Sequence, residues 1–558
     1  MKIDYRNDNT KIIFLGGVEE IGINSTLYVY KNSGILVDLG LGFSEYDYYG
    51  IDAIVPNISY IKKSNILLHG IVITHGHLDH IGAIQYLIET LNFPYIYGTQ
   101  FTIEILKTKL EEKNLLNKTL HKLRIIKHTD ILTFENFEVK FFHVNHSIPQ
   151  SLGLYIKTPS AKIIHTGDFK FDNSPVNEPV TDYAKITEYS KDNIDILLAD
   201  STNSTKKGYP VSESDVAKNL ADTIERAKGR VIVATFSGLV GRLYQLIDIA
   251  KIYNRKVAIV GYSLNQTLRI AQEIGYIRIP QNTIVPIENV SKMHPSKIMI
   301  LTTGAQGEEN AGLSLMANDG YKGIKLKKGD TVIISAKTIV GNDKAVQNMI
   351  DKISSSGAIV LQSEYVDFFT SGHGYQEDQK IMMNLVKPKF FIPIHGYQYF
   401  LRAHAETAKN VGISETNILI PKRGSIVSGN SINGFKITGQ IKCEPLIVSG
   451  SGVGDVGYVV VKEREQLANF GIIIINIVLK EDKTLMRDPY VVSKGFIYVK
   501  RNQEILQKIS DISKQTYNNY YKNFKDLNRI KEKIQAEVSK YIFQETERDP
   551  VIQIILNY

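Results

Sequence analysis

Short apolar runs separated by glycine-rich and polar turns fill the first two hundred or so residues. The runs are "KIIFLGG", "STLYVY", "GILVDLG", "GIVITHGH", "AKIIHTGD" and "IDILLAD". Apolar runs of this length, bounded by turn residues, predict β-strands. Several of them end in histidine or aspartate, which predicts chemically capable side chains at one edge of a sheet. Between them, "DHIGAIQYLIETL" has apolar residues at helical spacing and predicts a helix that begins near Asp79 or His80.

From about Val211 the pattern changes to alternating helical and strand-like segments. These segments are "SESDVAKNLADTIERAKGRVIVATF", "GRLYQLIDIAKIYNRKVAIVGYSL" and "GDTVIISAKTIVGNDKAVQNMIDKISSSGAIVL". Such alternation predicts a parallel sheet covered by helices. Near Ser371 the earlier style returns with "SGHG" and "FFIPIHGY". The second domain is therefore predicted to be inserted within the first.

The C-terminal part of the chain follows a Gly/Ser-rich hinge candidate, "VSGSGVGDVGY". Two strand-like runs come next, "FGIIIINIVL" and "GFIYVK", and then a long amphipathic stretch from Gln503 to Phe543. We expect helices packed on a small sheet. The predicted domains are residues 1–208 and 369–448 for the two parts of the first domain, 209–368 for the inserted domain, 449–460 for a linker and 461–558 for a C-terminal domain.

Composition limits the class of protein. A chain of 558 residues is too long for one core, and its hydrophobic fraction of 43% and charged fraction of 22% are ordinary for a globular protein. The net charge of +8 permits an anionic partner such as nucleic acid without requiring one. The single cysteine, Cys443, excludes an internal disulfide and cysteine-based zinc sites. With no signal-peptide or membrane-spanning pattern, we expect a cytoplasmic protein without membrane contact.

Four of the thirteen histidines lie between His69 and Ile88, in "HGIVITHGHLDHIGAIQYLI". The plain alternative is a strand-to-helix turn with surface histidines. However, the spacing His75-x-His77-x-Asp79-His80 allows alternate side chains of a tight loop to point in two directions. Such a set cannot wrap one tetrahedral ion comfortably but can serve two, and imidazole with carboxylate suits Zn²⁺ or Mn²⁺. Further candidate ligands are His146, Asp168 and His395.

These motifs carry a resemblance to known families. "HGHLDH", "HSIPQS", "HTGD" and "PIHG" resemble the motif series of the metallo-β-lactamase fold, and "LLADSTN" with "TSGHG" resembles the β-CASP nucleic-acid subgroup. "FLGGVEEIGIN", "GDFKFDNSPV", "TTGAQGE" and the tail segments "VGDVGYVVVKEREQL", "SKGFIYVK" and "ETERDPVI" resemble bacterial ribonuclease J over essentially the whole chain. The resemblance implies an α/β fold: a metallo-β-lactamase αββα sandwich, an inserted β-CASP α/β domain and a small α+β C-terminal domain.

The resemblance also implies a dinuclear metal site. One cation would be held by His75, His77 and His146, the other by Asp79, His80 and His395, with Asp168 as a bridge and Asp38 beneath the ligand loop. Zn²⁺ is the favoured cation, with Mn²⁺ and Mg²⁺ as alternatives. The other histidines have no counterpart in the family pattern and are assigned to the surface or the core; they are His69, His121, His128, His143, His165, His294 and His404.

Among these ligands, Asp79 is the best placed to accept a proton from the attacking water. By the same resemblance, His373, supported by Asp200, would stabilise or protonate the departing 3′ oxygen. Judged from the residues alone, His373 could be a helix-capping loop residue and Asp200 a strand-ending turn residue. A structural Ca²⁺ is implied at the backbone carbonyls of Tyr49 and Ile51 and the carboxylate of Asp455.

The chain departs from the family in the pocket for a 5′-terminal phosphate. The family's His-x-Ser-Gly-His loop is here Phe369, Thr370, Ser371, Gly372 and His373, so Phe369 replaces a histidine. In the facing tract Ser237, Gly238 and Leu239, the last two replace a polar Ser-Asn pair. Because phosphate binding needs charged or hydrogen-bonding donors, we expect a weakened preference for 5′-monophosphate ends.

The implied function is hydrolysis of single-stranded RNA, as a 5′–3′ exonuclease, an endonuclease or both, in mRNA decay and rRNA maturation. The C-terminal domain implies a homodimer or homotetramer, or a hetero-oligomer with a ribonuclease J paralogue. An alternative is a catalytically weak paralogue that acts mainly as the partner subunit of an active enzyme. A small-molecule hydrolase of the same metal fold is disfavoured by the inserted domain and the long tail.

Overall fold

The computed structural model describes residues 8–42, 50–318, 320–339, 341–363, 366–497, 503–523 and 526–557. The chain divides into two compact units. The first comprises residues 1–42 and 55–445, and the second comprises residues 43–54 and 446–558. The candidate chemistry lies in the first unit.

Two sheets form the centre of the first unit. The eight-stranded sheet contains, in spatial order, β20 (Gly434–Gln440), β19 (Ser425–Asn430), β1 (Thr10–Gly16), β2 (Ser25–Tyr30), β3 (Ser33–Val37), β5 (Leu67–Val72), β6 (Tyr95–Gly98) and β7 (Leu123–Ile125). The six-stranded sheet contains β18 (Phe390–Ile394), β12 (Ile196–Asp200), β11 (Ala161–His165), β10 (Leu152–Thr158), β9 (Phe137–His143) and β8 (Ile131–Phe134). The six apolar runs singled out near the N-terminus are all strands of these two sheets, as predicted.

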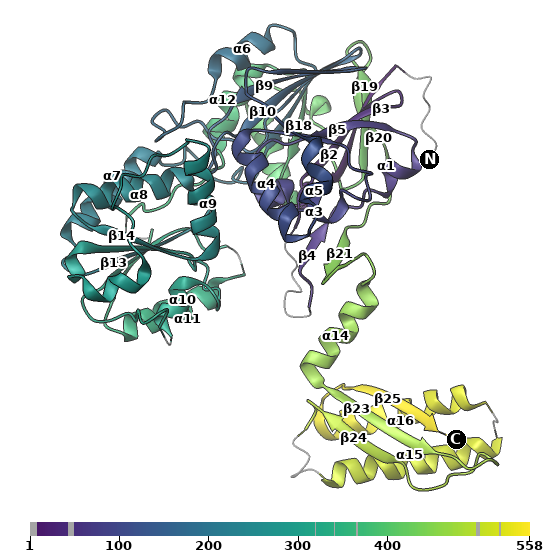
Figure 1. Ribbon diagram of the computed structural model, residues 1–558. Helices are drawn as coiled ribbons and strands as arrows, with labels where there is room; N and C mark the ends of the chain where they lie inside the picture. Colours follow the sequence, from purple (N-terminus) through teal and green to yellow (C-terminus); the bar gives the residue numbers. More distant parts are fainter. Residues whose placement is uncertain are drawn as a thin grey trace. The chain divides into compact units, whose positions relative to one another are not determined.

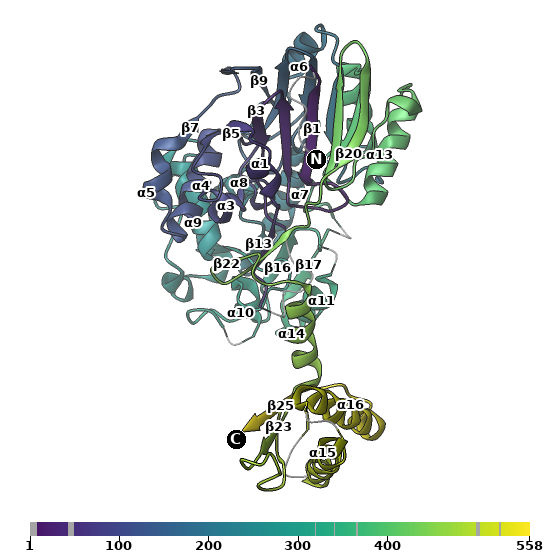
Figure 2. The same cartoon turned by 90° about the vertical axis from the view of Figure 1, so that its right-hand side faces the viewer.

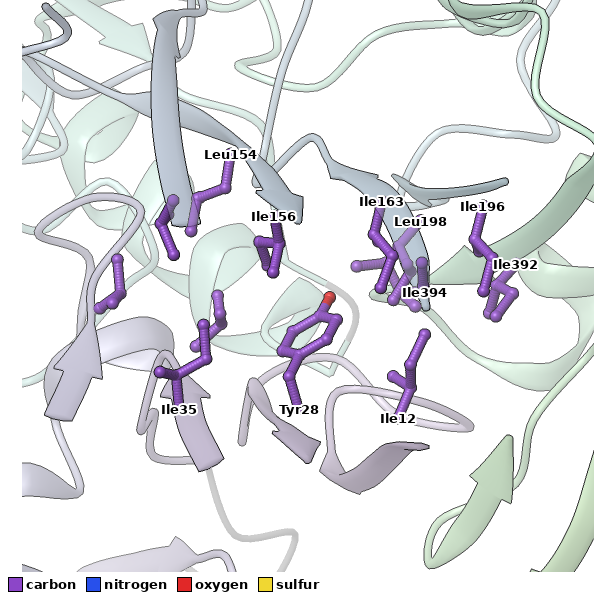
Figure 3. Packing of buried hydrophobic residues seen from close by; sticks show 14 of the residues in the cluster. Ile12, Tyr28, Ile35, Leu154, Ile156, Ile163, Ile196, Leu198, Ile392 and Ile394 are labelled. Carbon is purple, nitrogen blue, oxygen red and sulfur yellow. The ribbon is translucent and has the colours of Figure 1, made fainter. Parts of the chain in front are cut away.

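The core between the sheets is built from alternate residues of facing strands (Figure 3). Tyr28 and Ile35 of the eight-stranded sheet face Leu154, Ile156 and Ile163 of the six-stranded sheet, and all five side chains are fully buried. Successive residues of a strand point to opposite faces, so the other face of each sheet is free to pack against helices.

Helices cover both outer sides of the paired sheets (Figures 1 and 2). On the eight-stranded sheet they are α1 (Ser59–Lys63), α2 (Leu78–Ile81), α3 (Ile84–Leu87), α4 (Gln100–Glu112), α5 (Leu116–Thr119) and the 3₁₀ turn η2 (Leu120–Lys122). On the six-stranded sheet they are α6 (Tyr183–Ser190), α12 (Gln376–Val386), α13 (Gln398–Asn410) and η5 (Glu415–Asn417). The first unit therefore contains the αββα sandwich that the family resemblance implies.

The inserted domain leaves the sandwich between two neighbouring strands. β12 and β18 pair in parallel, with Asp200 opposite Ile394. The chain between them builds a parallel sheet in the order β14 (Lys256–Val260), β15 (Ile298–Thr302), β13 (Val231–Thr235), β16 (Thr331–Ser335) and β17 (Ile359–Leu361). Figure 1 shows its helices on both faces: α7 (Glu213–Arg226), α8 (Val240–Ile252) and α9 (Tyr262–Glu273) on one, and α10 (Gly312–Ala317) and α11 (Asp343–Ser355) on the other. Two 3₁₀ turns, η3 (Ile287–Lys292) and η4 (Pro295–Lys297), complete it.

A buried ion pair stabilises the inserted domain at the start of two adjacent strands. The Arg230 guanidinium Nε donates to Asp330 Oδ1 at 2.9 Å, and both side chains are buried. Substituting Arg230→Met leaves the Asp330 carboxylate buried without its partner, so we expect this domain to lose about 3 kcal/mol of stability. Hydrogen exchange of the β13 and β16 amides measures the change. The exposed Arg226→Met is the control, and equal exchange in both variants would contradict the expectation.

The second unit contains two small sheets. One consists of β22 (Gly452–Val453), β21 (Leu446–Ser449) and β4 (Ala53–Val55), and the other of β24 (Tyr490–Lys494), β23 (Ile472–Val478) and β25 (Val551–Asn557). Its helices are α14 (Tyr458–Phe470), α15 (Gln503–Asn523) and α16 (Leu527–Thr546). Every second residue of β23, from Ile473 to Ile477, is fully buried in a core that also contains Ile534 and Val538. This is the α+β domain expected at the C-terminus.

The C-terminal elements differ in detail from the expectation. The amphipathic stretch is two helices. A strand is present at Tyr490–Lys494, directly before "GFIYVK", and residues 498–500 of that expected strand fall outside the described part. β25, which pairs in parallel with β23, was not predicted. The proposed linker 449–460 includes β22 and the first residues of α14. The division into domains at the predicted boundaries stays a prediction.

The helix expected after the ligand-rich loop is interrupted. It forms two short helices, α2 and α3, separated by Gly82 and Ala83. The Asp79 carbonyl, which a continuous helix would use for the Ala83 amide, instead accepts hydrogen bonds from the Asn24 backbone and side chain, both at 3.1 Å. The Ala83 amide donates to the Leu39 carbonyl at 3.1 Å. Hydrogen bonds to Asn24 and Leu39 thus replace the helical hydrogen bond between Asp79 and Ala83, and they fix the loop that carries the candidate ligands.

Candidate metal centre

The candidate ligands come from the ends of strands that meet at one edge of the sandwich. His75 and His77 follow β5, Asp168 follows β11, and His395 follows β18. His146 lies three residues after β9. His395 has a left-handed backbone with φ of 53°, a conformation that is uncommon outside glycine.

Three imidazoles converge in a first cluster. His77 Nδ1 lies 3.1 Å from His75 Nε2 and 3.1 Å from His146 Nε2. Burial holds the pKa of His75 and His146 well below the usual range and lowers the pKa of His77 to about 4. The three rings are therefore neutral near pH 7. Their nitrogen lone pairs converge on one point, and there are too few ring protons there for each lone pair to accept a hydrogen bond. A bound cation could accept these lone pairs instead.

A second cluster combines two histidines with two aspartates. His80 Nε2 and His395 Nε2 each lie 3.5 Å from Asp79 Oδ2, and His395 Nδ1 lies 2.7 Å from Asp168 Oδ1. Burial opposes protonation of His395, but the Asp168 carboxylate outweighs it and raises the pKa of His395 to about 10. His395 Nε2 is buried and has no hydrogen-bond partner within the described part of the chain. The concentration of carboxylate charge and this unpartnered nitrogen both fit a cation.

The Asp168 carboxylate faces both clusters. Its Oδ2 atom lies 3.2 Å from His80 Nε2 and 3.7 Å from both His75 Nε2 and His146 Nε2. Within each cluster the ligand atoms all lie within 4.8 Å of one another. Imidazole nitrogen and carboxylate oxygen together form a donor set that divalent cations such as Zn²⁺ and Mn²⁺ accept.

Asp38 supports the ligand loop from below. Its carboxylate accepts hydrogen bonds from Thr74 N and Thr74 Oγ1, both at 2.8 Å, and lies 2.8 Å from His80 Nδ1. The Asp38 backbone has a φ of 59°. Bonding at Nδ1 orients the His80 ring so that Nε2 faces Asp168, as outer partners of metal-binding histidines do.

His373 and Asp200 form a pair beside the two clusters. His373 Nδ1 lies 2.7 Å from Asp200 Oδ2, and Asp200 Oδ1 accepts hydrogen bonds from Thr202 N and Thr202 Oγ1. Burial disfavours the charged imidazole, but Asp200 outweighs it and raises the pKa of His373. The His373 side chain is 21% exposed, whereas that of Asp200 is 2% exposed. His373 therefore reaches solvent while Asp200 fixes its orientation.

Gly372 is required by close packing against His146. Its carbonyl accepts a hydrogen bond from His146 Nδ1 at 2.7 Å, and an added Cβ atom would lie 2.7 Å from Ser147 Oγ and 2.8 Å from His146 Cε1. Gly372→Ala should displace the His146 ring and weaken divalent-cation binding by about 10- to 100-fold. Competition with a chromophoric zinc chelator measures the affinity. Gly457→Ala, where a Cβ would meet nothing within 4 Å, is the control; unchanged zinc affinity in the Gly372 variant would show that the packing is dispensable.

Apart from His373, the predicted phosphate-pocket residues carry no charged side chain. Ser371 Oγ accepts from Asn203 Nδ2 at 2.7 Å and from the His373 amide, and Thr370 Oγ1 donates to the Val211 carbonyl. The Phe369 ring packs edge-on against Phe236 at a centroid distance of 6.4 Å. In the facing tract, Leu239 is buried and Ser237 is half-buried. Gly238 lies close to the first histidine cluster, since an added Cβ atom would be 3.1 Å from His77 Nε2.

The candidate calcium residues belong to the second unit. Tyr49 lies outside the described residues. Asp455 packs closely against Gly452, and Ile51 lies beside Asp52, whose amide donates to the Val448 carbonyl. Among the described residues, Asp455 is in none of the groups whose ligand atoms come together. The calcium site stays a prediction.

Asn24 is a site residue that sequence reasoning missed. Its Nδ2 atom lies 3.1 Å from His80 Nε2 and 3.4 Å from Asp79 Oδ2. No local pattern marks it, because its role depends on the ligand loop folding against it. Four histidines without a family counterpart have other partners: Ser33 for His69, the Pro179 carbonyl for His143, Tyr28 for His165 and Ser201 for His404.

Among the described residues, no helix is both long enough and apolar enough to span a membrane.

Known families match the chain in consecutive segments. The family described as "Metallo-beta-lactamase superfamily" matches residues 18–210, "Ribonuclease J, beta-CASP domain" residues 228–353, "Zn-dependent metallo-hydrolase RNA specificity domain" residues 358–421, and "Ribonuclease J C-terminal domain" residues 459–557. The third of these supports RNA as the bound nucleic acid.

Several characterised proteins align with nearly the whole chain. "Ribonuclease J 1" of Streptococcus pyogenes is 34% identical over 99% of this chain and 98% of its own length. "Ribonuclease J2" of Bacillus subtilis is 33% identical over 98% of both chains, and "Ribonuclease J" of Helicobacter pylori is 36% identical over 90% of this chain and 72% of its own. A crystal structure of a protein of unknown function from Enterococcus faecalis has the same fold over 75% of this chain, with a TM-score of 0.54 and 15% identity.

Proposed function

Since this chain belongs to the ribonuclease J family and is a metal-dependent ribonuclease, we propose that it hydrolyses phosphodiester bonds of single-stranded RNA with two divalent cations. The observation that supports this most strongly is the Asp168 carboxylate, which faces both ligand clusters. The chain would act in mRNA decay and rRNA maturation in the cytoplasm.

The proposed ligands divide into two sets around Asp168. His75, His77 and His146 hold one cation, and Asp79, His80 and His395 hold the other. Zn²⁺ is the proposed cation, with Mn²⁺ and Mg²⁺ as alternatives. When bound, two such cations lower the pKa of a water molecule and neutralise charge on the phosphate oxygens.

The residues of the chain move the protons. Asp79 is the proposed acceptor for the proton of the attacking water, because its side chain is 22% exposed while that of Asp168 is 3% exposed. His373 is the proposed proton donor to the departing 3′ oxygen. Its Nδ1 atom is engaged by Asp200, so Nε2 is left for the substrate. Asp200 keeps the imidazole charged and oriented until the proton is transferred.

The 5′ end of the RNA is proposed to be held weakly by the loop Phe369–His373 and the tract Ser237–Leu239. Phe369 and Leu239 provide no donor for a phosphate, and Ser371, whose Oγ accepts from Asn203, can offer only an uncharged hydroxyl donor. End-labelled RNAs carrying 5′-monophosphate, triphosphate or hydroxyl should be cleaved at comparable rates in Mn²⁺, Mg²⁺ or Zn²⁺, with internal products appearing early. Efficient stepwise degradation confined to 5′-monophosphorylated RNA would contradict this; His77→Ala is the inactive control.

A second candidate function is that of a partner subunit with little activity of its own. The apolar residues in the phosphate pocket favour it, whereas the complete set of ligands favours an active nuclease. In a mixture with an active ribonuclease J paralogue, His77→Ala should leave complex formation and total activity unchanged if the chain is only a partner. A fall in total activity indicates a catalytic role.

We also propose a homodimer or homotetramer, or a hetero-oligomer with a paralogue, formed through the C-terminal domain, which light scattering of the full chain tests. A structural Ca²⁺ at Tyr49, Ile51 and Asp455 is proposed on the family pattern. Calcium content measured in wild type and Asp455→Ala tests that assignment.

A further inference from the structure

Two lysines from different parts of the first unit lie on loops that are hydrogen-bonded to the segment that carries His373. Lys206 lies in the loop after β12, and Lys337 lies in the loop after β16 of the inserted domain. The charge of Lys337 acts on Lys206, and the Lys206 ammonium lies 4.9 Å from the centroid of the Tyr375 ring. The two lysines belong to loops that are far apart in the sequence.

Both loops are tied to the segment that carries His373. The Lys206 carbonyl accepts a hydrogen bond from the Gln376 amide at 3.0 Å. Ser335, two residues before Lys337, donates its hydroxyl to the Phe368 carbonyl at 2.6 Å. The Lys337 carbonyl accepts from Gln306 Nε2 at 2.9 Å, which fixes its backbone. The backbone segments that carry the two lysines are therefore fixed by hydrogen bonds, and the loops to which they belong are bonded to the chain on either side of Phe369–His373.

We propose that Lys206 and Lys337 together bind one phosphate group of the RNA at the rim of the metal site, an assignment that rests on the proposed function. The phosphate is either the 5′-terminal group or an internal phosphodiester of the bound strand. The pair supplies the positive charge that Phe369 and Leu239 cannot supply.

The charges at this position favour an anion. Neither ammonium forms an ion pair with a carboxylate within the part of the chain that the structure describes. Burial and the charge of Lys337 lower the pKa of Lys206 to about 8. Two cations held together repel each other, and an anion between them replaces that repulsion with two attractions. Lysine ammonium groups bind phosphate as point charges.

An aromatic ring accompanies the positive charge at this position. The Tyr375 ring lies beneath the Lys206 ammonium and fixes one of the two positive groups. Lys206 is half-buried, and its carbonyl is bonded to Gln376, close after His373 in the sequence. Proteins that bind single-stranded RNA combine positive charge with aromatic side chains.

Binding to the full-length chain in EDTA tests the pair without cleavage. Fluorescence anisotropy of a 3′-labelled single-stranded RNA, with a 5′-phosphate or a 5′-hydroxyl, is measured over a range of salt concentrations. The variants are Lys206→Met, Lys337→Met and the double variant, which keep an apolar stem. Lys207→Met, an exposed neighbour of equal charge, is the matched control, and Lys206→Arg keeps the charge at the site.

We expect each single substitution to raise the Kd about 5- to 10-fold, and the double variant to flatten the slope of log K against log salt concentration by about 0.7, the contribution of one phosphate contact on a single strand. Lys207→Met and Lys206→Arg should stay near wild type. A loss confined to the 5′-phosphate RNA identifies the terminal group, and an equal loss with both RNAs identifies an internal phosphate.

Two results would count against the proposals in different ways. If wild type binds RNA and the double variant binds it with the same Kd and salt slope, the lysine pair does not hold a phosphate. If wild type neither binds RNA in EDTA nor cleaves it with Mn²⁺, the proposed function itself is wrong, and the assignment of the pair is wrong with it.

Discussion

Asp168→Asn should lower the rate of RNA cleavage by at least about a thousandfold, equivalent to about 4 kcal/mol of transition-state stabilisation. The reason is that one carboxylate faces both ligand clusters, with Oδ2 at 3.2 Å from His80 Nε2 and 3.7 Å from His75 Nε2 and His146 Nε2. The amide keeps the size of the side chain but removes the negative charge between the two proposed cation positions. Metal content by mass spectrometry should fall below that of wild type.

The control for this substitution is Asp222→Asn, which removes an exposed carboxylate from α7. It should leave both the cleavage rate and the metal content unchanged. An Asp168→Asn protein that keeps its full metal content and cleaves RNA within about tenfold of the wild-type rate would rule out a bridging role, since tenfold corresponds to only about 1.4 kcal/mol.

His373→Ala should lower the cleavage rate by about a hundredfold to ten thousandfold, the range for removal of a general acid. His373 Nδ1 is held by Asp200 at 2.7 Å, so the charged imidazole can present the proton on Nε2 to the departing 3′ oxygen. Metal content should stay at the wild-type level, because the seven proposed ligands are intact. Single-turnover rates with saturating enzyme measure the chemical step apart from RNA binding.

A modified substrate separates proton donation from a structural role of His373. In an RNA whose scissile linkage has sulfur in place of the bridging 3′ oxygen, the thiolate leaves without protonation. The defect of His373→Ala should therefore shrink on this substrate, whereas that of Asp168→Asn should persist. An equal defect of His373→Ala on the sulfur and oxygen linkages would mean that the residue only positions the loop.

Many strands of the sandwich could be predicted from the sequence, because they are short apolar runs that end in candidate metal-binding histidines and aspartates. The runs before His75 and Asp168 form β5 and β11 of the two facing sheets. The return of the same style near His395 indicated that β18 rejoins the first domain, and its pairing with β12 confirms this. The hydrophobic pattern indicates which residues are buried, so it predicted the strands of the two sheets well.

Contacts between distant segments could not be predicted. The interruption of the helix at Gly82 depends on Asn24 taking the Asp79 carbonyl, a hydrogen bond across 55 positions. The meeting of Lys206 with Lys337 depends on how the inserted domain packs on the loop after β12. β25 was missed because its partner β23 lies on the far side of two helices in the sequence. In each case the signal lies in the tertiary fold and not in the local pattern.

The pairing of β12 with β18 has a consequence for the order of folding. Asp200 emerges from the ribosome before the inserted domain, whereas His395 emerges only after it, although the two strands that carry them are neighbours. A non-local parallel pair of this kind forms slowly, because the chain between its strands must first bring its ends together. The inserted sheet can fold on the way and shorten that distance. His395 therefore joins the other proposed ligands last, and uptake of the proposed second cation should mark completion of the native first unit.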